Sequence, residues 1–333
     1  MKNIKFVPSI VTGRLSEADA KAYFSRFGWF VFVYFLINSL LQSAFAITVY
    51  YLLPSFYTHY LFAEFLSFVP NYLLALPLAY TIVRPLPSDV PMKEKMGAKE
   101  LAIGFCICWA LMMVGNYISQ FVIGVFQAMR GGGIENPLAT AVSGMPMWAN
   151  LLFVVVLAPV LEELVFRRLM CKKLLVIGEG YAIVLSSAAF ALCHGNFYQL
   201  FYAFTLGCFF AFIYVKTGRI IYTIIYHMAV NFLGGFVAPL LVEWLSDTSG
   251  ELEGLIISAG NLVPYIVYMW YSFMSIGLAV FGIVIIIKKR REFSIHEGLL
   301  PPPEKKGASC VLLSGGVAAS IALFALTLLG SLM

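Results

Sequence analysis

Residues 159–168 have the sequence Pro-Val-Leu-Glu-Glu-Leu-Val-Phe-Arg-Arg, which places two adjacent glutamates, Glu162 and Glu163, in an apolar stretch. A carboxylate at the centre of a bilayer costs about 2.5–3.5 kcal/mol on insertion scales. Two side by side therefore need partners or a function. In a helix, Glu163 and Arg167 lie one turn apart with the acid N-terminal to the base, which favours an ion pair. Glu162 points about 100° away, so the same arginine does not serve it.

The composition of the whole chain indicates the class of protein. Hydrophobic residues make up 61% of the 333 residues, charged residues make up 12%, and the mean hydropathy is +0.88. A soluble domain has about 25% charged residues. We therefore predict an all-α, polytopic membrane bundle of about eight or nine spans, each needing ~20 apolar residues. The expected spans, of which the fifth is short, are 28–53, 61–83, 101–126, 148–168, 181–196, 198–215, 220–240, 263–287 and 311–333.

Positive charge gathers on one side of these spans. With nine spans, 21 of the 22 Lys and Arg residues fall on the side of the N-terminus, and only Arg130 falls on the other. The positive-inside rule then predicts a cytosolic N-terminus and an outer C-terminus. The net charge of +5 is thus an orientation signal that could involve anionic lipid, and we expect no nucleic-acid partner. The first 27 residues lack the early apolar core of a cleavable signal sequence.

This pattern divides the chain into four parts. Residues 1–27 form an expected cytosolic arm, with a short helix that begins near Ser16 because Asp19 has capping-box spacing. Residues 28–147 form N-terminal transmembrane helices, and 148–240 form the core that carries the candidate site. Residues 241–333 form C-terminal transmembrane helices with a Pro-rich cytosolic linker; the last helix, rich in Gly, Ala and Ser, is expected to be peripheral.

Two histidines lie in apolar segments close to the glutamate pair. His194 ends the run Phe-Ala-Leu-Cys-His, and His227 precedes Asn231 by four residues, so these two share a helical face. Glu162 could act as a general base on water, while His227 and Asn231 could bind a metal or donate to an oxyanion. Each group also has a structural explanation. His194 could donate to a backbone carbonyl, and His227 and Asn231 could form interhelical hydrogen bonds worth about 0.6 kcal/mol each.

A structural explanation exists for the glutamates too. Both could pair with arginines near the cytosolic interface, with Arg168 serving Glu162. The shared location of both histidines and both glutamates in neighbouring spans favours a functional site over these separate explanations.

Three motifs now follow one another on consecutive membrane helices. They are Glu162-Glu163-x-x-x-Arg167, Phe190-x-x-x-His194 and His227-x-x-x-Asn231. In this order they resemble the CPBP family of intramembrane proteases, which contains the CAAX prenyl endopeptidases and bacterial proteins grouped as Abi or bacteriocin-immunity proteins. The resemblance covers residues 162–231.

The resemblance implies hydrolysis of a peptide bond by direct attack of water, without an acyl-enzyme. By position, Glu162 resembles the family's catalytic glutamate and His194 the histidine that helps to polarise the water. His227 and Asn231 match the pair that stabilises the oxyanion. The remaining two motif residues, the second acid Glu163 and the arginine Arg167, are interpreted as a structural ion pair.

Participation of a metal stays open at this stage. Glu162, His194 and His227 could supply three zinc ligands with an open position. However, the chain has no His-Glu-x-x-His spacing, and a glutamate acting without a metal accounts for Asn231 equally well. We favour metal-independent chemistry, with zinc as the alternative and no other cofactor.

Two other classes of function are considered. A non-catalytic immunity or peptide-binding protein would use the same spans, although every position of the presumed catalytic set is filled. A proton-coupled transporter would carry an inverted repeat, and the sequence shows no such symmetry. The expected substrate is a membrane-associated peptide or protein, and the expected location is the bacterial plasma membrane.

The depth of the site is the last expectation. Glu162 lies six residues before Arg168, about 9 Å along a helix, which favours a site that opens toward the cytosol. If the fifth helix begins at Tyr181, His194 would lie about 20 Å deep. Gly178 and Gly180 would permit a later start.

Overall fold

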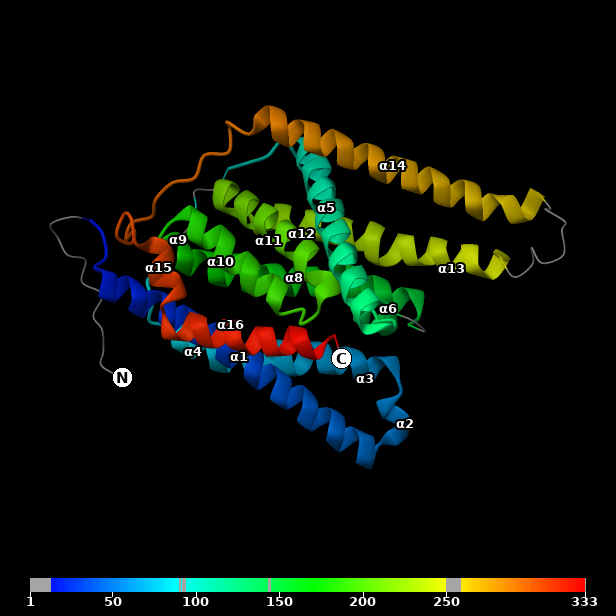
Figure 1. Cartoon of the computed structure of the whole chain (residues 1–333), viewed down its shortest axis with the longest axis horizontal. Helices are drawn as coiled ribbons and strands as arrows, with labels where there is room; N and C mark the ends of the chain where they lie inside the picture. Colours follow the sequence, from blue (N-terminus) through cyan, green and yellow to red (C-terminus); the bar gives the residue numbers. More distant parts are fainter. Residues whose placement is uncertain (1–12, 90, 92–93, 143–144, 250–258, 333) are drawn as a thin grey trace.

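The computed structural model describes residues 13–89, 91, 94–142, 145–249 and 259–332, and these residues are predominantly helical. Figure 1 shows a helical bundle in which the long helix Ala98–Arg130 runs steeply across the direction of several other long helices. Seven helical runs are long and apolar enough to cross a membrane: Glu17–Leu52, Tyr60–Val83, Ala98–Arg130, Met147–Leu175, Phe197–Thr217, Ile220–Ser246 and Leu262–Lys289. The predicted all-α polytopic membrane fold is therefore confirmed.

Several of these runs combine α-helix with π-helix, here labelled η. The elements in chain order are α1 (Glu17–Leu52), α2 (Pro54–Tyr57), α3 (Tyr60–Phe68), η1 (Val69–Ala75), α4 (Leu76–Val83), α5 (Ala98–Arg130), α6 (Pro137–Val142), α7 (Met147–Asn150), η2 (Leu151–Leu157), α8 (Ala158–Glu163), η3 (Leu164–Cys171), α9 (Lys172–Leu175), α10 (Glu179–Leu192), α11 (Phe197–Thr217), α12 (Ile220–Val230), η4 (Asn231–Val237), α13 (Ala238–Ser249), α14 (Ala259–Lys289), α15 (Gly307–Leu312) and α16 (Gly315–Gly330).

The first helix differs from its prediction. The side chain of Ser16 accepts a hydrogen bond from the backbone N–H of Asp19 at 3.1 Å, so the helix begins where the cap predicts. It then continues without a break past residue 28 as α1, with Tyr23 and Phe24 buried. A separate arm helix is therefore wrong, because apolar side chains in this stretch pack into the bundle. Residues 1–12 of the predicted arm lie outside the described residues.

The fifth expected span, 181–196, is the largest error in helix boundaries. Helix α10 begins at Glu179 and ends at Leu192, so its 14 residues extend about 21 Å and are too few to cross a bilayer. A turn follows in which Gly195 adopts a positive φ of 67°. His194 therefore lies in the turn between α10 and α11, and the later helix start that Gly178 and Gly180 would permit is not observed.

The last helix is closely packed. An added Cβ on Gly316 would lie 1.9 Å from the backbone oxygen of Ser25, and one on Gly28 would lie 2.2 Å from the backbone of Gly316. Ser320 donates to the carbonyl of Gly28 at 2.8 Å. Small residues thus let α16 approach α1 at backbone distance, as is typical of helix pairs in membranes. Ile321, Leu326 and Leu329 on the same helix stay exposed, so this close packing agrees with a position at the periphery of the bundle.

The two ends of the bundle differ in charge. The end called here the basic end holds α9, α15 and the end of α14 (Figure 1). It also holds the described segments 84–89 and 94–97 between α4 and α5, and the connection 216–219. The opposite end, called the far end, holds α2 and α6. The Lys- and Arg-rich connections thus meet at one end, in agreement with the charge pattern of the sequence.

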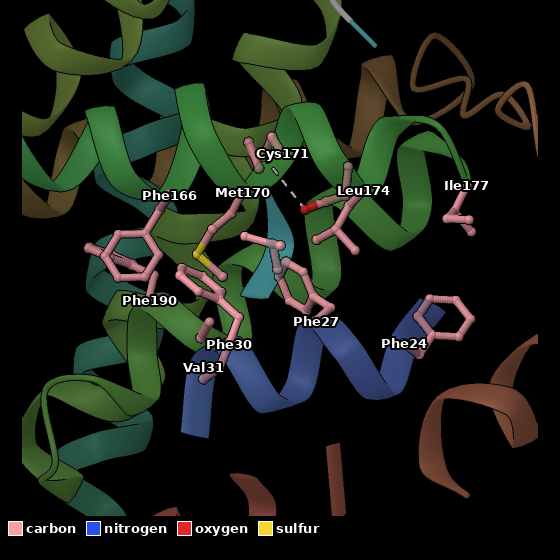
Figure 2. Close-up of a cluster of buried hydrophobic side chains, with 14 of the residues drawn as sticks. Phe24, Phe27, Phe30, Val31, Phe166, Met170, Cys171, Leu174, Ile177 and Phe190 are labelled. Atoms are coloured by element: carbon pink, nitrogen blue, oxygen red, sulfur yellow. Dashed lines mark hydrogen bonds between the residues drawn. The ribbon is translucent and has the colours of Figure 1, made fainter. Parts of the chain in front are cut away.

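The half of the bundle toward the basic end is filled by a hydrophobic core. In Figure 2 the aromatic rings of Phe27 and Phe30 on α1 lie next to Leu174 and Met170, and the ring of Phe24 lies farther along α1. These five side chains are all at most 3% exposed. The core therefore fixes η3 and α9 against α1 directly beyond the glutamate pair.

Candidate active site

The glutamates lie in one continuous helical run, Met147–Leu175, whose hydrogen-bond pattern changes along its length. Pro159 stands in the first turn of α8 and has no N–H to donate, so the preceding segment, η2, adopts the wider π-helical pattern. A second π-helical segment, η3, begins directly after Glu163. Such segments are frequent at functional sites. Here they flank the short helix that carries both carboxylates.

Glu163 is neutralised inside the protein. Its Oε2 lies 3.2 Å from Nε of Arg167, and both side chains are fully buried. The contact is an ion pair without the alignment of a good hydrogen bond. The guanidinium also lies over two aromatic rings, 4.7 Å from the centroid of Phe190 and 5.4 Å from that of Phe210. These contacts close the site on the side of the basic end.

His227 lies between the two glutamates. Its Nδ1 is 3.0 Å from Oε1 of Glu163, and its Nε2 is 3.6 Å from Oε2 of Glu162. Because an ionised carboxylate only accepts, Nδ1 carries the hydrogen in this contact. The ring stacks on Phe210 at a centroid distance of 5.1 Å and meets the edge of Phe190 at 5.7 Å. The imidazole is thus held between one carboxylate near each of its nitrogens, and two aromatic rings contact it.

Glu162 is the less constrained of the two carboxylates. Its side chain is 22% exposed, whereas that of Glu163 is 0% exposed. In the described part of the chain Glu162 makes no ion pair with Arg168, whose side chain is exposed. The structural explanation that pairs both glutamates with arginines is therefore wrong for Glu162.

His194 is held by the turn that contains it. Its Nδ1 lies 2.8 Å from the carbonyl oxygen of Phe190, so this nitrogen carries the hydrogen and Nε2 is an acceptor in the neutral ring. Asn196 then caps α11 by accepting from the N–H of Gln199 at 2.9 Å, and it donates back to the carbonyl of His194 at 2.8 Å. One ring nitrogen thus has the backbone partner of the structural explanation, and the other remains available for chemistry.

Asn231 lies at the junction of α12 and η4. Its Nδ2 donates to the carbonyl oxygen of Val154 on η2 at 2.9 Å. A primary amide has two N–H donors, so one hydrogen ties η4 to η2 and the second is left for a ligand. Asn231 therefore combines the interhelical hydrogen bond with a free donor.

A cavity of about 420 Å³ brings the predicted catalytic residues together. Glu162, His194, His227 and Asn231 all line it. A smaller cavity of about 90 Å³ is lined by Glu162 and His194 again, together with Tyr34, Asn38, Asn71, Tyr72 and Cys193. Glu162 and His194 therefore stand where the two cavities adjoin.

The larger cavity extends toward the far end. Asn136 and Met145, in the connection between α5 and α7, are among its lining residues. Toward the basic end, the buried pair of Glu163 and Arg167 and the aromatic core fill the space. This lining does not support the expectation of a site that opens toward the basic end, which the charge pattern predicts to be cytosolic. The number of residues between Glu162 and Arg168 gives the depth of Glu162 along its helix. It does not show which end of the site is filled by packed side chains.

Several lining residues were not predicted as part of the site. Glu64 on α3, Asn116 and Gln120 on α5, and Tyr198 on α11 line the larger cavity. Their signal was present in the sequence, because polar side chains inside apolar spans are usually functional or face the bundle interior. Asn116 and Gln120 in addition stand one turn apart.

The three residues considered as zinc ligands, Glu162, His194 and His227, line the same cavity. Nδ1 of His227 is bound to Glu163, and Nε2 faces Glu162 at 3.6 Å. Among the described residues no group of three or more His, Cys, Asp or Glu side chains could hold a metal ion.

Comparison with known proteins agrees with this site. Residues 144–233 match the family model of the type II CAAX prenyl endopeptidase Rce1-like proteins. The chain is 27% identical over 207 residues to "Putative membrane peptidase YdiL" of Bacillus subtilis (strain 168), covering 59% of this chain and 81% of that one. It is 31% identical over 162 residues to the membrane-embedded CAAX protease MroQ of Staphylococcus aureus (strain USA300), covering 45% of this chain and 62% of MroQ. No solved structure matches the chain significantly.

An all-α membrane bundle with this glutamate and histidine site has the features of a membrane peptidase. The matched segment contains all the residues from which the resemblance was drawn, Glu162 to Asn231. The family-model match over residues 144–233 and the two relatives together support a CPBP-family membrane protease.

Proposed function

We propose that this chain is an intramembrane endopeptidase that hydrolyses a peptide bond of a membrane-associated peptide or protein, in a bacterial plasma membrane, by glutamate-activated water. The observation that supports it most is the position of His227 between two carboxylates of different character. Glu163, buried and paired with Arg167, holds Nδ1 of the ring. Glu162, partly exposed, faces Nε2 and lines both cavities.

The charges of this cluster favour a proton shared by Glu162 and His227. Two carboxylates and one guanidinium leave a single negative charge, which is costly inside a membrane. A proton on Nε2 of His227 makes the four groups neutral in total. Nε2 then donates toward Glu162 and, once a substrate is bound, can donate to a substrate oxygen.

The reaction follows from these assignments. A water molecule next to Glu162 donates a hydrogen bond to Nε2 of His194 and loses its other proton to the carboxylate. The resulting hydroxide forms a bond to the carbonyl carbon, and the carbonyl oxygen becomes negative. His227 and the free N–H of Asn231 donate to that oxygen. Glu162 then passes the proton to the leaving nitrogen as the C–N bond breaks, which gives a carboxylic acid and an amine.

The test compares peptide termini in membranes that contain equal amounts of wild type and Glu162→Gln. Removal of the base should abolish the termini produced by the wild type, while the isosteric amide keeps the fold. His194→Ala and His227→Ala should also abolish them.

Each variant needs a thermal unfolding curve, so that loss of cleavage is separated from loss of fold. If Glu162→Gln produced the same termini at the same yield as an active wild type, the mechanism would be ruled out. An identical set of termini in wild type and Glu162→Gln, with both folded, would favour a binding or immunity protein instead.

A further inference from the structure

Two carboxylates, Glu64 and Glu162, line the larger cavity, and its described lining contains no lysine or arginine. Glu162 stands at the inner end. Glu64 stands one turn into α3, which begins at the far end. Glu64 is half-buried, and within the described chain it makes no ion pair. A half-buried carboxylate without a counter-charge is a strong attractor for a cation, because the surrounding dielectric is lower than that of water.

The wall between these carboxylates carries neutral hydrogen-bonding groups. Asn116 and Gln120 lie one turn apart on α5, with Nε2 of Gln120 3.4 Å from Oδ1 of Asn116. The hydroxyl of Tyr198 donates to the carbonyl of Ile134 at 2.7 Å and keeps its lone pairs as acceptors. Amides and hydroxyls of this kind pair with a peptide backbone, which has both donors and acceptors.

The distribution of charge at the far end also favours the binding of a cationic group. Arg130 is the one cation that the sequence places there, and it donates to the backbone carbonyl of Leu332 at 2.6 Å. Glu135, the neighbour of the lining residue Asn136, is exposed on this side. A cavity approached through an excess of carboxylates attracts cationic molecules and repels anionic ones.

We propose that the larger cavity selects peptide segments that carry a lysine or arginine near the cleaved bond, and that Glu64 binds this cationic side chain. The proposal rests on the endopeptidase function proposed above. The substrate reaches the site from the far end, which the charge pattern assigns to the outer face. Acidic residues near the bond are disfavoured, because both Glu64 and Glu162 oppose them.

The experiment measures which sequences are cut. Peptide termini are compared by mass spectrometry in membranes that contain wild type, Glu162→Gln, Glu64→Gln, Glu64→Lys or Glu243→Gln at equal abundance. Termini that depend on Glu162 define the cut sites. We expect Lys or Arg within a few residues of these sites. Glu64→Gln should lower their yield about tenfold, as for loss of a charged hydrogen bond, and Glu64→Lys should abolish them. The control Glu243→Gln changes an exposed carboxylate outside the cavity lining and should leave them unchanged.

A peptide pair then separates binding from folding. From one identified site, two fluorogenic peptides are made that differ only by Lys or norleucine at the basic position. Glu64→Gln should raise KM for the lysine peptide and leave its kcat unchanged. Both constants for the norleucine peptide should stay unchanged. A general loss of stability would slow both peptides alike.

The outcomes are distinct. Glu162-dependent sites without a Lys or Arg preference, or with the same preference in Glu64→Gln, would overturn this proposal and leave the endopeptidase intact. Absence of any Glu162-dependent site would overturn the proposed function itself. If Glu64→Lys fails to fold, the isosteric Glu64→Gln decides alone.

Discussion

The bundle has a filled half toward the basic end and a hollow half toward the far end, and the candidate site lies where they meet. In the filled half, rings from α1 pack on Met170 and Leu174 (Figure 2), with little space between them. In the hollow half, a cavity of about 420 Å³ extends from Glu162 toward Asn136. The filled half can therefore hold the reactive groups rigidly, and the hollow half leaves room for a substrate.

The difference also separates two adjacent glutamates. Glu163 faces the filled half, where Arg167 neutralises it and two aromatic rings enclose the guanidinium. Glu162 faces the hollow half and keeps partial exposure. A shift of one residue along a helix, about 100°, thus separates a structural carboxylate from a reactive one.

The largest expected effect comes from removing the charge that closes the filled half. Arg167→Met keeps most of the volume but leaves Glu163 buried without its partner, which costs about 3–5 kcal/mol for a broken buried pair. The neighbouring Arg168→Met changes an exposed arginine and should cost much less. Yield and thermal unfolding in detergent measure both.

A second substitution identifies the cause of that loss. Adding Glu163→Gln to Arg167→Met removes the stranded charge and should recover part of the stability, whatever happens to activity. Equal stability of the single and double variants would show that packing, and not the buried carboxylate, explains the effect.

A methionine in each half tests the packing directly. Met170, 1% exposed, lies in the filled core, whereas Met112, 8% exposed, lines the larger cavity. Met170→Ala should cost about 2 kcal/mol, the lower end of the range for core truncations, because helix association in lipid depends on packing more than on hydrophobicity. Met112→Ala enlarges an existing space and should cost less than half as much.

Chemical denaturation of the two variants in the same detergent gives this comparison. Equal losses would mean that the wall of the cavity is packed as tightly as the core, which would contradict the division into two halves.

The parts that the sequence could predict are those set by local geometry. The contact of Glu163 with Arg167 follows from the spacing of four residues in a helix, and the face shared by His227 and Asn231 follows in the same way. The position of His227 between Glu162 and Glu163 does not, because it depends on how two helices 64 residues apart in sequence pack together.

Two features that were predicted wrongly or not at all, the end of the fifth helix and the role of Glu64, are indicated by local sequence. Gly195-Asn196 is a typical turn and helix-cap pair, and it would have ended the fifth helix before His194. Glu64 is a carboxylate in an apolar span, and such a residue indicates a functional position in the same way as Glu162. The direction of the cavity had no local signal, since it depends on which half of the bundle the side chains fill.

A glycine in each half gives a comparison in which the two changes in stability are expected to differ in sign. An added Cβ on Gly316 would meet the backbone of α1 at 1.9 Å, whereas nothing lies within 4 Å of one on Gly234, which lines the cavity. Gly316→Ala should separate α16 from α1 and cost about 1–3 kcal/mol, as for overpacking. Gly234→Ala adds a methyl group to open space in a helix and should leave stability unchanged or raise it by up to about 1 kcal/mol. Thermal unfolding of the two variants measures the sign of each change. A gain for Gly316→Ala would show that α16 approaches α1 less closely than described, and a loss for Gly234→Ala would show that the hollow half is narrower at η4.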